Sequence, residues 1–239
     1  MRVLVVHSGG LDSTVVLALA RNDVNNEVET VSFSYGSRHE QMELGAALRI
    51  AGYYNVQNTC VVVPQIFGER SALLFGGKTE MPHQTYKQIR EMEGPSLTVV
   101  PFRNGVFLAM AVALAAGKDF DEVHAGMHAE DAHHSAYPDC RFDFVGAFSA
   151  AAYIGTYHKV KVVAPLINMQ KADVVWCGAK LNVPFGLTWS CYDPVSTEES
   201  GTFACGLCPT CVERIEAFKA CGYVDRVPYA IDIDWGGPK

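Results

Sequence analysis

The stretch that most constrains the fold is residues 2–19, where an apolar run, a glycine turn and a helical pattern follow one another. Residues 3–6 read Val-Leu-Val-Val, which is typical of a strand buried on both faces of a sheet. Gly9 and Gly10 come next, and glycines allow a positive φ angle and a close approach of the backbone to a ligand. A helical pattern follows over residues 15–19, and we expect Asp12, Ser13 or Thr14 to cap it.

This order of elements directs the first N–H groups of a helix, at the positive end of its dipole, toward the turn, an arrangement that suits a phosphate. Shape alone leaves a capped turn without a ligand as the alternative. The letters are more specific, because residues 8–13 read Ser-Gly-Gly-Leu-Asp-Ser. They resemble the SGGxDS signature of the PP-loop ATP pyrophosphatases. The resemblance implies that ATP binds at His7, Ser8, Gly9, Gly10, Leu11, Asp12, Ser13 and Thr14.

Strand and helix patterns alternate along most of the chain. We expect strands at residues 3–6, 28–34, 59–63, 122–126 and 160–164, and helices at 39–54, 106–118, 140–157 and 171–181. This alternation predicts an α/β fold with a doubly wound, mainly parallel five-stranded sheet of Rossmann-like type. Ligands of such sheets bind beyond the carboxyl ends of the strands, where the opening loop lies. Residues 66–97 and 128–139 are expected to be irregular, and the tail 222–239 has little pattern, with a peripheral end.

Composition is that of a soluble globular protein, with 49% apolar and 19% charged residues. The formal net charge of −7 gives the surface no general attraction for nucleic acid, so a nucleic-acid partner is not expected. The longest apolar helix candidate, residues 106–116, is too short to span a bilayer, so no membrane partner is expected. Because the sequence runs directly into its first strand, we expect a cytoplasmic protein, whose eight cysteines are free or metal-bound.

Four of the cysteines are clustered in the C-terminal part. Cys205, Cys208 and Cys211 form two overlapping CxxC steps, and Cys191 precedes them across a polar loop. Four thiolates at this spacing predict one tetrahedral Zn²⁺ in a closed, structural site, with an iron–sulfur cluster as the less common alternative. We therefore divide the chain into an α/β domain at 1–185 and a zinc-binding segment at 186–239 that packs on it. The other cysteines, Cys60, Cys140, Cys177 and Cys221, are interpreted as structural.

Further segments narrow the resemblance. They are Ser-Tyr-Gly-Ser-Arg-His at 34–39, Pro-Phe-Arg-Asn at 101–104, Tyr-Pro-Asp-Cys-Arg at 137–141, Ala-Pro-Leu at 164–166, Lys-Ala-Asp at 171–173 and Thr-Trp-Ser-Cys-Tyr at 188–192. In this order they resemble the QueC family, 7-cyano-7-deazaguanine synthase, over nearly the whole length. The resemblance implies a fold of the adenine nucleotide alpha hydrolase type, a zinc-binding C-terminal segment and a homodimer. It also implies the conversion of 7-carboxy-7-deazaguanine, ATP and ammonia to the nitrile, for queuosine biosynthesis.

The resemblance also assigns roles to residues. Asp12, Ser13, Arg103 and Lys171 are the candidate catalytic residues, with Asp12 near Mg²⁺ and with Arg103 and Lys171 neutralising charge at the reacting phosphorus. The candidates for binding the deazaguanine or its carboxylate are Tyr35, Arg38, Tyr137, Asp139 and Arg141. The alternatives are that Lys171 only caps its helix, that Arg103 pairs with a surface acid and that Tyr35 is a packed aromatic. His39, His128, His133 and His134 are interpreted as loop histidines, and Asp131 is a further candidate to face the substrate.

Departures from the family pattern keep other functions open. Ser37 replaces the usual Gln, residues 127–131 match the usual loop loosely, and thirteen residues separate Cys191 from Cys205. A long insertion between metal ligands is tolerated, since loop-closure entropy grows slowly with length. The alternatives are a related enzyme that stops at the amide or modifies another acceptor in phage DNA modification or defence, a PP-loop tRNA-modifying enzyme, and a non-enzymatic zinc-ribbon module.

Overall fold

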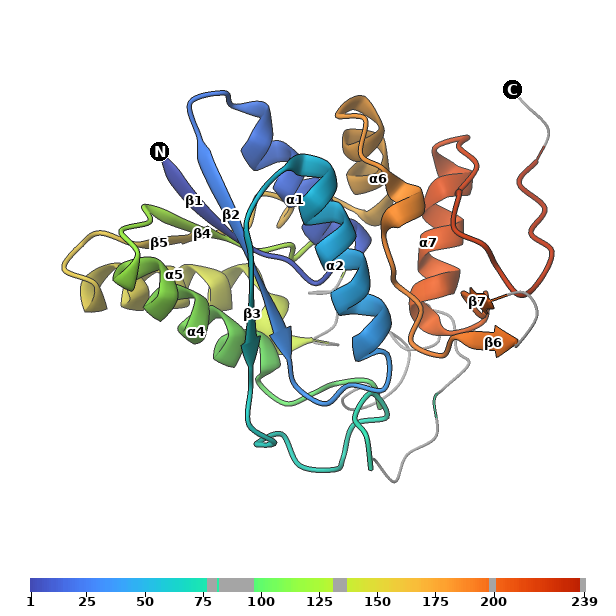
Figure 1. Cartoon of the computed structure of the whole chain (residues 1–239), viewed down its shortest axis with the longest axis horizontal. Helices are drawn as coiled ribbons and strands as arrows, with labels where there is room; N and C mark the ends of the chain where they lie inside the picture. Colours follow the sequence, from blue (N-terminus) through green and yellow to red (C-terminus); the bar gives the residue numbers. More distant parts are fainter. Residues whose placement is uncertain (77–80, 82–96, 131–136, 198–200, 237–239) are drawn as a thin grey trace.

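A parallel five-stranded sheet forms the centre of the computed structural model (Figure 1), which describes residues 1–76, 81, 97–130, 137–197 and 201–236. The strands are β1 (Arg2–Val6), β2 (Glu27–Ser34), β3 (Asn58–Val62), β4 (Glu122–His124) and β5 (Lys161–Val163), in the order β3-β2-β1-β4-β5. Every neighbouring pair is parallel. The predicted fold class is therefore confirmed, and all five predicted strands are present.

Helices cover both faces of the sheet (Figure 1). The helices α1 (Leu11–Asn22), α2 (Glu40–Tyr54) and α6 (Lys171–Lys180) lie on one face, and α4 (Arg103–Gly117) and α5 (Phe142–Gly155) lie on the other. The central strand explains this arrangement, because Val3 and Val5 pack into the core under α1 while Leu4 packs into the core under α4. All three side chains are fully buried, as the uninterrupted apolar run predicts.

The order in which successive strands are added to the sheet reverses at β1. It passes from β1 outward through β2 to β3, and then returns to β4 on the other side of β1, so that Val3 is paired with both Val28 and Glu122. The loops that follow β1 and β4 therefore diverge and leave a crevice between them. In open α/β sheets this switch point is where ligands bind.

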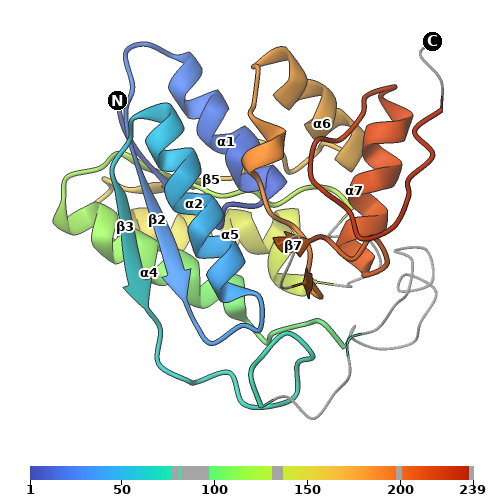
Figure 2. The same cartoon turned by 45° about the vertical axis from the view of Figure 1, so that its right-hand side comes forward.

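The C-terminal part contains regular structure that the sequence did not reveal. An antiparallel hairpin, β6 (Val195–Thr197) and β7 (Gly201–Phe203), precedes the helix α7 (Pro209–Ala220), which packs beside α6 (Figure 2). Two short 3₁₀ turns, η2 (Pro138–Cys140) and η3 (Phe185–Leu187), complete the described elements. Proline is well tolerated in the first turn of a helix, so α7 can begin directly after Cys208.

The described part of the tail, residues 222–236, contains no helix or strand, as expected, but its end is not peripheral. Asp225 and Val227 are buried, and Trp235 packs against the core with its ring 6.2 Å from that of Tyr229. Arg214 of α7 is 2% exposed and donates two hydrogen bonds to Asp225, of 2.6 and 3.0 Å. The paired charges bind the tail to the rest of the C-terminal segment.

Arg214 also secures the chain before the cysteine cluster. Its guanidinium donates to the hydroxyls of Thr188 and Ser190, at 2.8 and 3.2 Å, and to the carbonyl of Phe185 at 3.0 Å.

In the part of the chain that the structure describes, no helix is long and apolar enough to cross a membrane.

We predict that Arg214→Ala destabilises the protein by about 3–5 kcal/mol, because it leaves the carboxylate of Asp225 buried without its partner. Urea unfolding followed by circular dichroism measures this change. The control is Lys159→Ala, which removes an ion pair with Asp119 whose side chains are 69% and 81% exposed. Equal stability of the two variants would contradict the prediction.

Candidate active site

The loop after β1 is built around a glycine that no other residue can replace without strain. Gly9 has φ of +80°, and a Cβ atom added to it would lie 2.5 Å from the backbone nitrogen of Ala47 and 2.6 Å from the carbonyl oxygen of Glu43. The loop is therefore pressed against the backbone of α2. This close approach is the physical reason for a glycine at this point of the sequence.

The start of α1 differs from our expectation. Gly10, in extended conformation, is the N-cap, and α1 begins at Leu11, so Asp12, Ser13 and Thr14 lie in the first turn and do not cap it. The hydroxyls of Ser13 and Thr14 instead donate to the carbonyl of Gly10, at 3.2 and 2.7 Å. The first N–H groups of a helix lack partners within it, so this turn offers them to a ligand.

An ammonium group lies against the loop. Lys171, the first residue of α6, is 8% exposed, and its Nζ donates to Asp12 Oδ2 at 2.8 Å. The same Nζ lies 3.1 Å from Glu213 Oε2 on α7 and 3.2 Å from His128 Nε2 after β4. Lys171 is thus a buried member of a charged cluster, which answers the alternative that it only caps its helix.

The environment of the loop tunes two of its side chains. Burial raises the pKa of Asp12, but the charges of Lys171 and His128 and the hydrogen bond from Lys171 outweigh it, and the net pKa lies below the ordinary value. Asp12 is therefore a carboxylate at neutral pH. Its Oδ1 is buried and has no hydrogen-bond partner among the described residues. Burial lowers the pKa of His7 to about 4, so this ring is neutral and adds no positive charge to the loop.

The pocket lining also contains a partly buried arginine among aromatic rings. Arg103, the first residue of α4, lies 5.8 Å from the ring centre of Tyr35 and 6.0 Å from that of Phe107, and its Nη1 donates to the Tyr35 hydroxyl at 3.4 Å. Phe33 and Phe107 are stacked with centroids 4.4 Å apart. Burial by itself lowers the pKa of Arg103, but Tyr35, Tyr192 and other neighbours raise it by more. The net pKa lies above the ordinary value, so the guanidinium stays charged.

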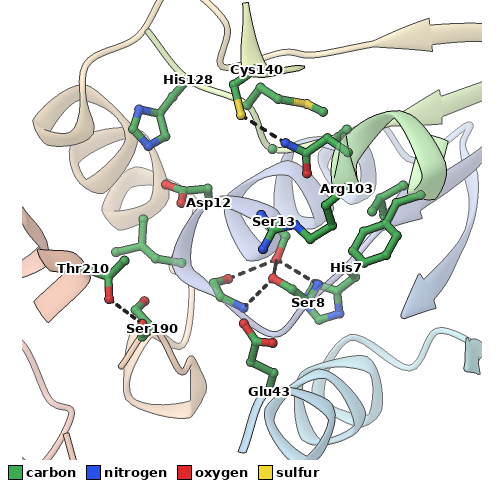
Figure 3. A pocket seen from close by; sticks show the side chains of 18 of the residues that line it. His7, Ser8, Asp12, Ser13, Glu43, Arg103, His128, Cys140, Ser190 and Thr210 are labelled. Carbon is green, nitrogen blue, oxygen red and sulfur yellow. Dashed lines mark hydrogen bonds between the residues drawn. The ribbon is translucent and has the colours of Figure 1, made fainter. Parts of the chain in front are cut away.

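One pocket collects these residues at the crevice between β1 and β4 (Figure 3). Gly126 after β4 approaches the loop so closely that a Cβ atom on it would lie 3.0 Å from Ser13 N. Asp12 and His128 lie on one side, and Ser8 and Glu43 lie on another (Figure 3). Of the predicted residues, the pocket contains His7, Ser8, Gly10, Leu11, Asp12, Ser13, Tyr35, Arg103, Tyr137 and Lys171.

The remaining candidates lie outside its lining. Asp139 is buried, but its carboxylate accepts a 2.8 Å hydrogen bond from the backbone N–H of Asn104 in the first turn of α4. It therefore positions the helix that carries Arg103. Arg38 is exposed and donates to the carbonyl of Leu74, and Arg141 forms an exposed pair with Asp143. Gly9 and Thr14 support the loop from behind, and Asp131, His133 and His134 lie outside the described residues.

The sequence analysis did not identify several residues that line the pocket, namely Glu43, His128, Trp189, Ser190, Tyr192, Thr210 and Glu213. The last five of these come from the C-terminal segment. His39 and His128 lie outside helices and strands, as the interpretation of both as loop histidines expects, but they are only 2% and 1% exposed. Burial raises the pKa of Tyr192 well above its ordinary value and keeps the phenol neutral. The sequence analysis used residues 188–192 only as part of the family resemblance and, apart from Cys191, gave them no role in a site.

The four predicted metal ligands meet. The Sγ atoms of Cys191, Cys205, Cys208 and Cys211 all lie within 4.8 Å of one another, and all four residues are buried. Backbone N–H groups donate to these sulfurs, from Cys205 to Cys191 at 3.2 Å and from Cys208 to Cys205 at 3.2 Å. Such hydrogen bonds stabilise thiolates, and the cluster can hold one metal ion.

The fold and the loop at its switch point define a protein of the PP-loop class. The family model described as "Queuosine biosynthesis protein QueC" matches residues 2–222, and the chain belongs to this family. Its relatives include the 7-cyano-7-deazaguanine synthases of a Nitratiruptor species, 37% identical over 96% of this chain and 99% of the relative, and of Thermoplasma volcanium, 40% identical over 96% and 91%.

A solved structure with a similar fold is the U34-tRNA thiolase NcsA from Methanococcus maripaludis with its [4Fe-4S] cluster. It matches with a TM-score of 0.52 and 16% identity, over 82% of this chain and 62% of that one. At this level of identity the likeness concerns the fold alone.

We predict that Gly9→Ala destabilises the protein by at least about 2 kcal/mol, because the left-handed conformation costs a side chain about 1–2 kcal/mol and the new Cβ meets the backbone of α2. Thermal unfolding measures the change. The matched control is Gly52→Ala on α2, where the new Cβ meets no atom within 4 Å and a helical alanine is favoured by up to about 1 kcal/mol. A stable Gly9→Ala protein would contradict the close approach.

Proposed function

We propose that this protein is a 7-cyano-7-deazaguanine synthase, an ATP-dependent ligase that converts 7-carboxy-7-deazaguanine and ammonia to the nitrile. The observation that carries the proposal is the pocket itself, in which the SGGLDS loop, a charged lysine cluster and an aromatic wall with a partly buried arginine face one crevice. Relatives with this name that match over nearly their whole length support the choice of reaction.

In the proposed reaction the substrate carboxylate attacks the α-phosphorus of ATP, and pyrophosphate leaves. Ammonia then attacks the acyl carbon of the adenylate, AMP leaves and a proton is lost, which gives the amide. A second ATP activates the amide oxygen in the same way. Loss of AMP and of the remaining nitrogen-bound protons forms the carbon–nitrogen triple bond.

The loop is suited to the nucleotide half of this chemistry. The N–H groups of the first turn of α1 and the hydroxyls of Ser8 and Ser13 offer donors for phosphate oxygens. The unpartnered Oδ1 of Asp12 fits a magnesium ion that accompanies the triphosphate, since Mg²⁺ is held by a few carboxylates together with phosphate oxygens. Lys171 and Arg103 both line the pocket and would balance charge that develops on the reacting phosphorus.

The aromatic wall is suited to the deazaguanine. Phe33, Tyr35, Phe107, Tyr137 and Tyr192 give the pocket flat apolar surfaces for a fused-ring base. Arg103 lies among them with a fork of donors that matches a carboxylate. Asp139 caps α4 and does not line the pocket, so another residue is needed to read the guanine-like edge of the base. Glu43 is our candidate, because it is a carboxylate that lines the pocket.

The test is incubation of the purified protein with MgATP, 7-carboxy-7-deazaguanine and ammonium, followed by mass spectrometry. We expect nitrile, AMP and pyrophosphate, and a loss of at least about a hundredfold in Arg103→Ala, because a positive charge that lines the pocket is removed. Amide without nitrile would assign the enzyme that stops at the amide. No AMP with any of these substrates would overturn the proposal.

For the cysteine cluster we propose a structural Zn²⁺. Four thiolates around one tetrahedral zinc lie about 3.8 Å apart, given a Zn–S distance of about 2.3 Å, and the Sγ atoms of Cys205 and Cys211 are 4.0 Å apart. When bound, the ion would fix the chain next to the four cysteines, from which Tyr192 and Thr210 line the pocket. The division at residue 185, the homodimer and the cytoplasmic location stay predictions.

We predict one zinc and no iron or labile sulfide per chain in elemental analysis. Cys208→Ser is expected to lose most of this metal and to unfold at a lower temperature, because structural zinc contributes directly to folding. The control is Cys60→Ser, which changes an exposed thiol on β3. Iron with labile sulfide would instead assign an iron–sulfur cluster.

A further inference from the structure

Glu213 is a buried carboxylate to which neither the proposed reaction nor the metal site gives a role. It belongs to α7, is 5% exposed and lines the pocket. Its Oε2 lies 3.1 Å from Lys171 Nζ, and its Oε1 lies 4.0 Å from His128 Nε2. A carboxylate is costly to bury, so its presence beside the loop requires a compensating contact, and the ammonium of Lys171 supplies it.

Three side-chain atoms lie close to the ammonium nitrogen of Lys171. They are Asp12 Oδ2 at 2.8 Å, Glu213 Oε2 at 3.1 Å and His128 Nε2 at 3.2 Å. An ammonium group has three N–H donors, so these contacts together fix its rotation as well as its position. The side chain of a lysine is otherwise a flexible four-carbon stem, whose charge would follow any nearby anion.

We propose that Glu213 is the positioning residue for Lys171, and that the C-terminal segment thereby sets the geometry of the phosphate-neutralising charge. The proposal rests on the proposed function. Glu213 holds the ammonium from α7 while Asp12 contacts it from the start of α1, so that Lys171 remains beside Asp12 when a triphosphate enters. Displacing a catalytic group by about 1 Å is enough to lower the rate about a hundredfold.

The surroundings of Glu213 are suited to this task. Cys211, one of the four clustered cysteines, lies two residues before it, and Arg214 follows it with its guanidinium bound to Asp225, Thr188, Ser190 and Phe185. The backbone that carries Glu213 is therefore fixed on both sides. A carboxylate on such a rigid helix can hold a flexible lysine within a fraction of an ångström.

Charge gives the proposal a distinctive signature. Removing the negative charge of Glu213 increases the net attraction of the site for a triphosphate, so ATP should bind as well as before or more tightly. Chemistry should become slower, because the ammonium is no longer held in place. A merely structural contribution of Glu213 would instead weaken ATP binding and metal retention together with the rate.

The variant is Glu213→Gln, which keeps the size of the side chain and removes its charge. Its matched control is Glu216→Gln on the same helix, where the side chain is exposed. For Glu213→Gln we expect zinc content as in the original protein, a dissociation constant for MgATP that is unchanged or lower in calorimetry, and a kcat that is at least about tenfold lower. Glu216→Gln should leave all three unchanged.

A kcat of Glu213→Gln within twofold of the original, or a lower kcat together with weaker ATP binding or lost zinc, would overturn the proposal. Crystal structures of both proteins test the positioning without any assay, since Lys171 Nζ should move away from Asp12 by more than about 0.5 Å in the variant. An unmoved Nζ contradicts it. Absence of product from the original protein counts against the proposed function alone.

Discussion

The ammonium of Lys171 is the point on which the candidate site depends. It contacts Asp12 in the first turn of α1, His128 in the loop after β4 and Glu213 on α7. These three segments lie far apart in the sequence. Burying so many charged groups is costly unless each has a partner at close range. The sheet topology meets this condition, because it brings the loop after β1, the loop after β4 and the start of α6 to the same crevice.

The C-terminal segment is part of this site rather than an appendage to it. Trp189, Ser190, Tyr192, Thr210 and Glu213 close the pocket on the side that the α/β core leaves open. Their positions are secured by the cysteine cluster and by the buried pair of Arg214 and Asp225, which ties α7 to the tail. A change that destabilises this segment is therefore expected to disturb the geometry of the pocket as well.

Local sequence patterns were sufficient to identify features that lie within a short stretch of chain. The glycine loop and the cysteine cluster are of this kind, because ligand spacing and backbone freedom are encoded within a few residues. Asp139 shows the limit. Its motif suggested a base-binding carboxylate, yet its oxygen caps α4, and only the packing of η2 against that helix reveals this. His128 shows the reverse, a polar loop residue by pattern that is buried beside Lys171.

The sequence by itself determined the fold class, the glycine loop after the first strand and the cysteine cluster that could hold a metal, because periodicity, glycine placement and CxxC spacing act over short distances along the chain. Only the tertiary structure decided which charged side chains share the crevice, that Arg38 and Arg141 lie outside it, and that α7 supplies Glu213 to it. The physical reason is that burial and charge pairing are set by segments that meet through packing, and no local pattern records which segments meet.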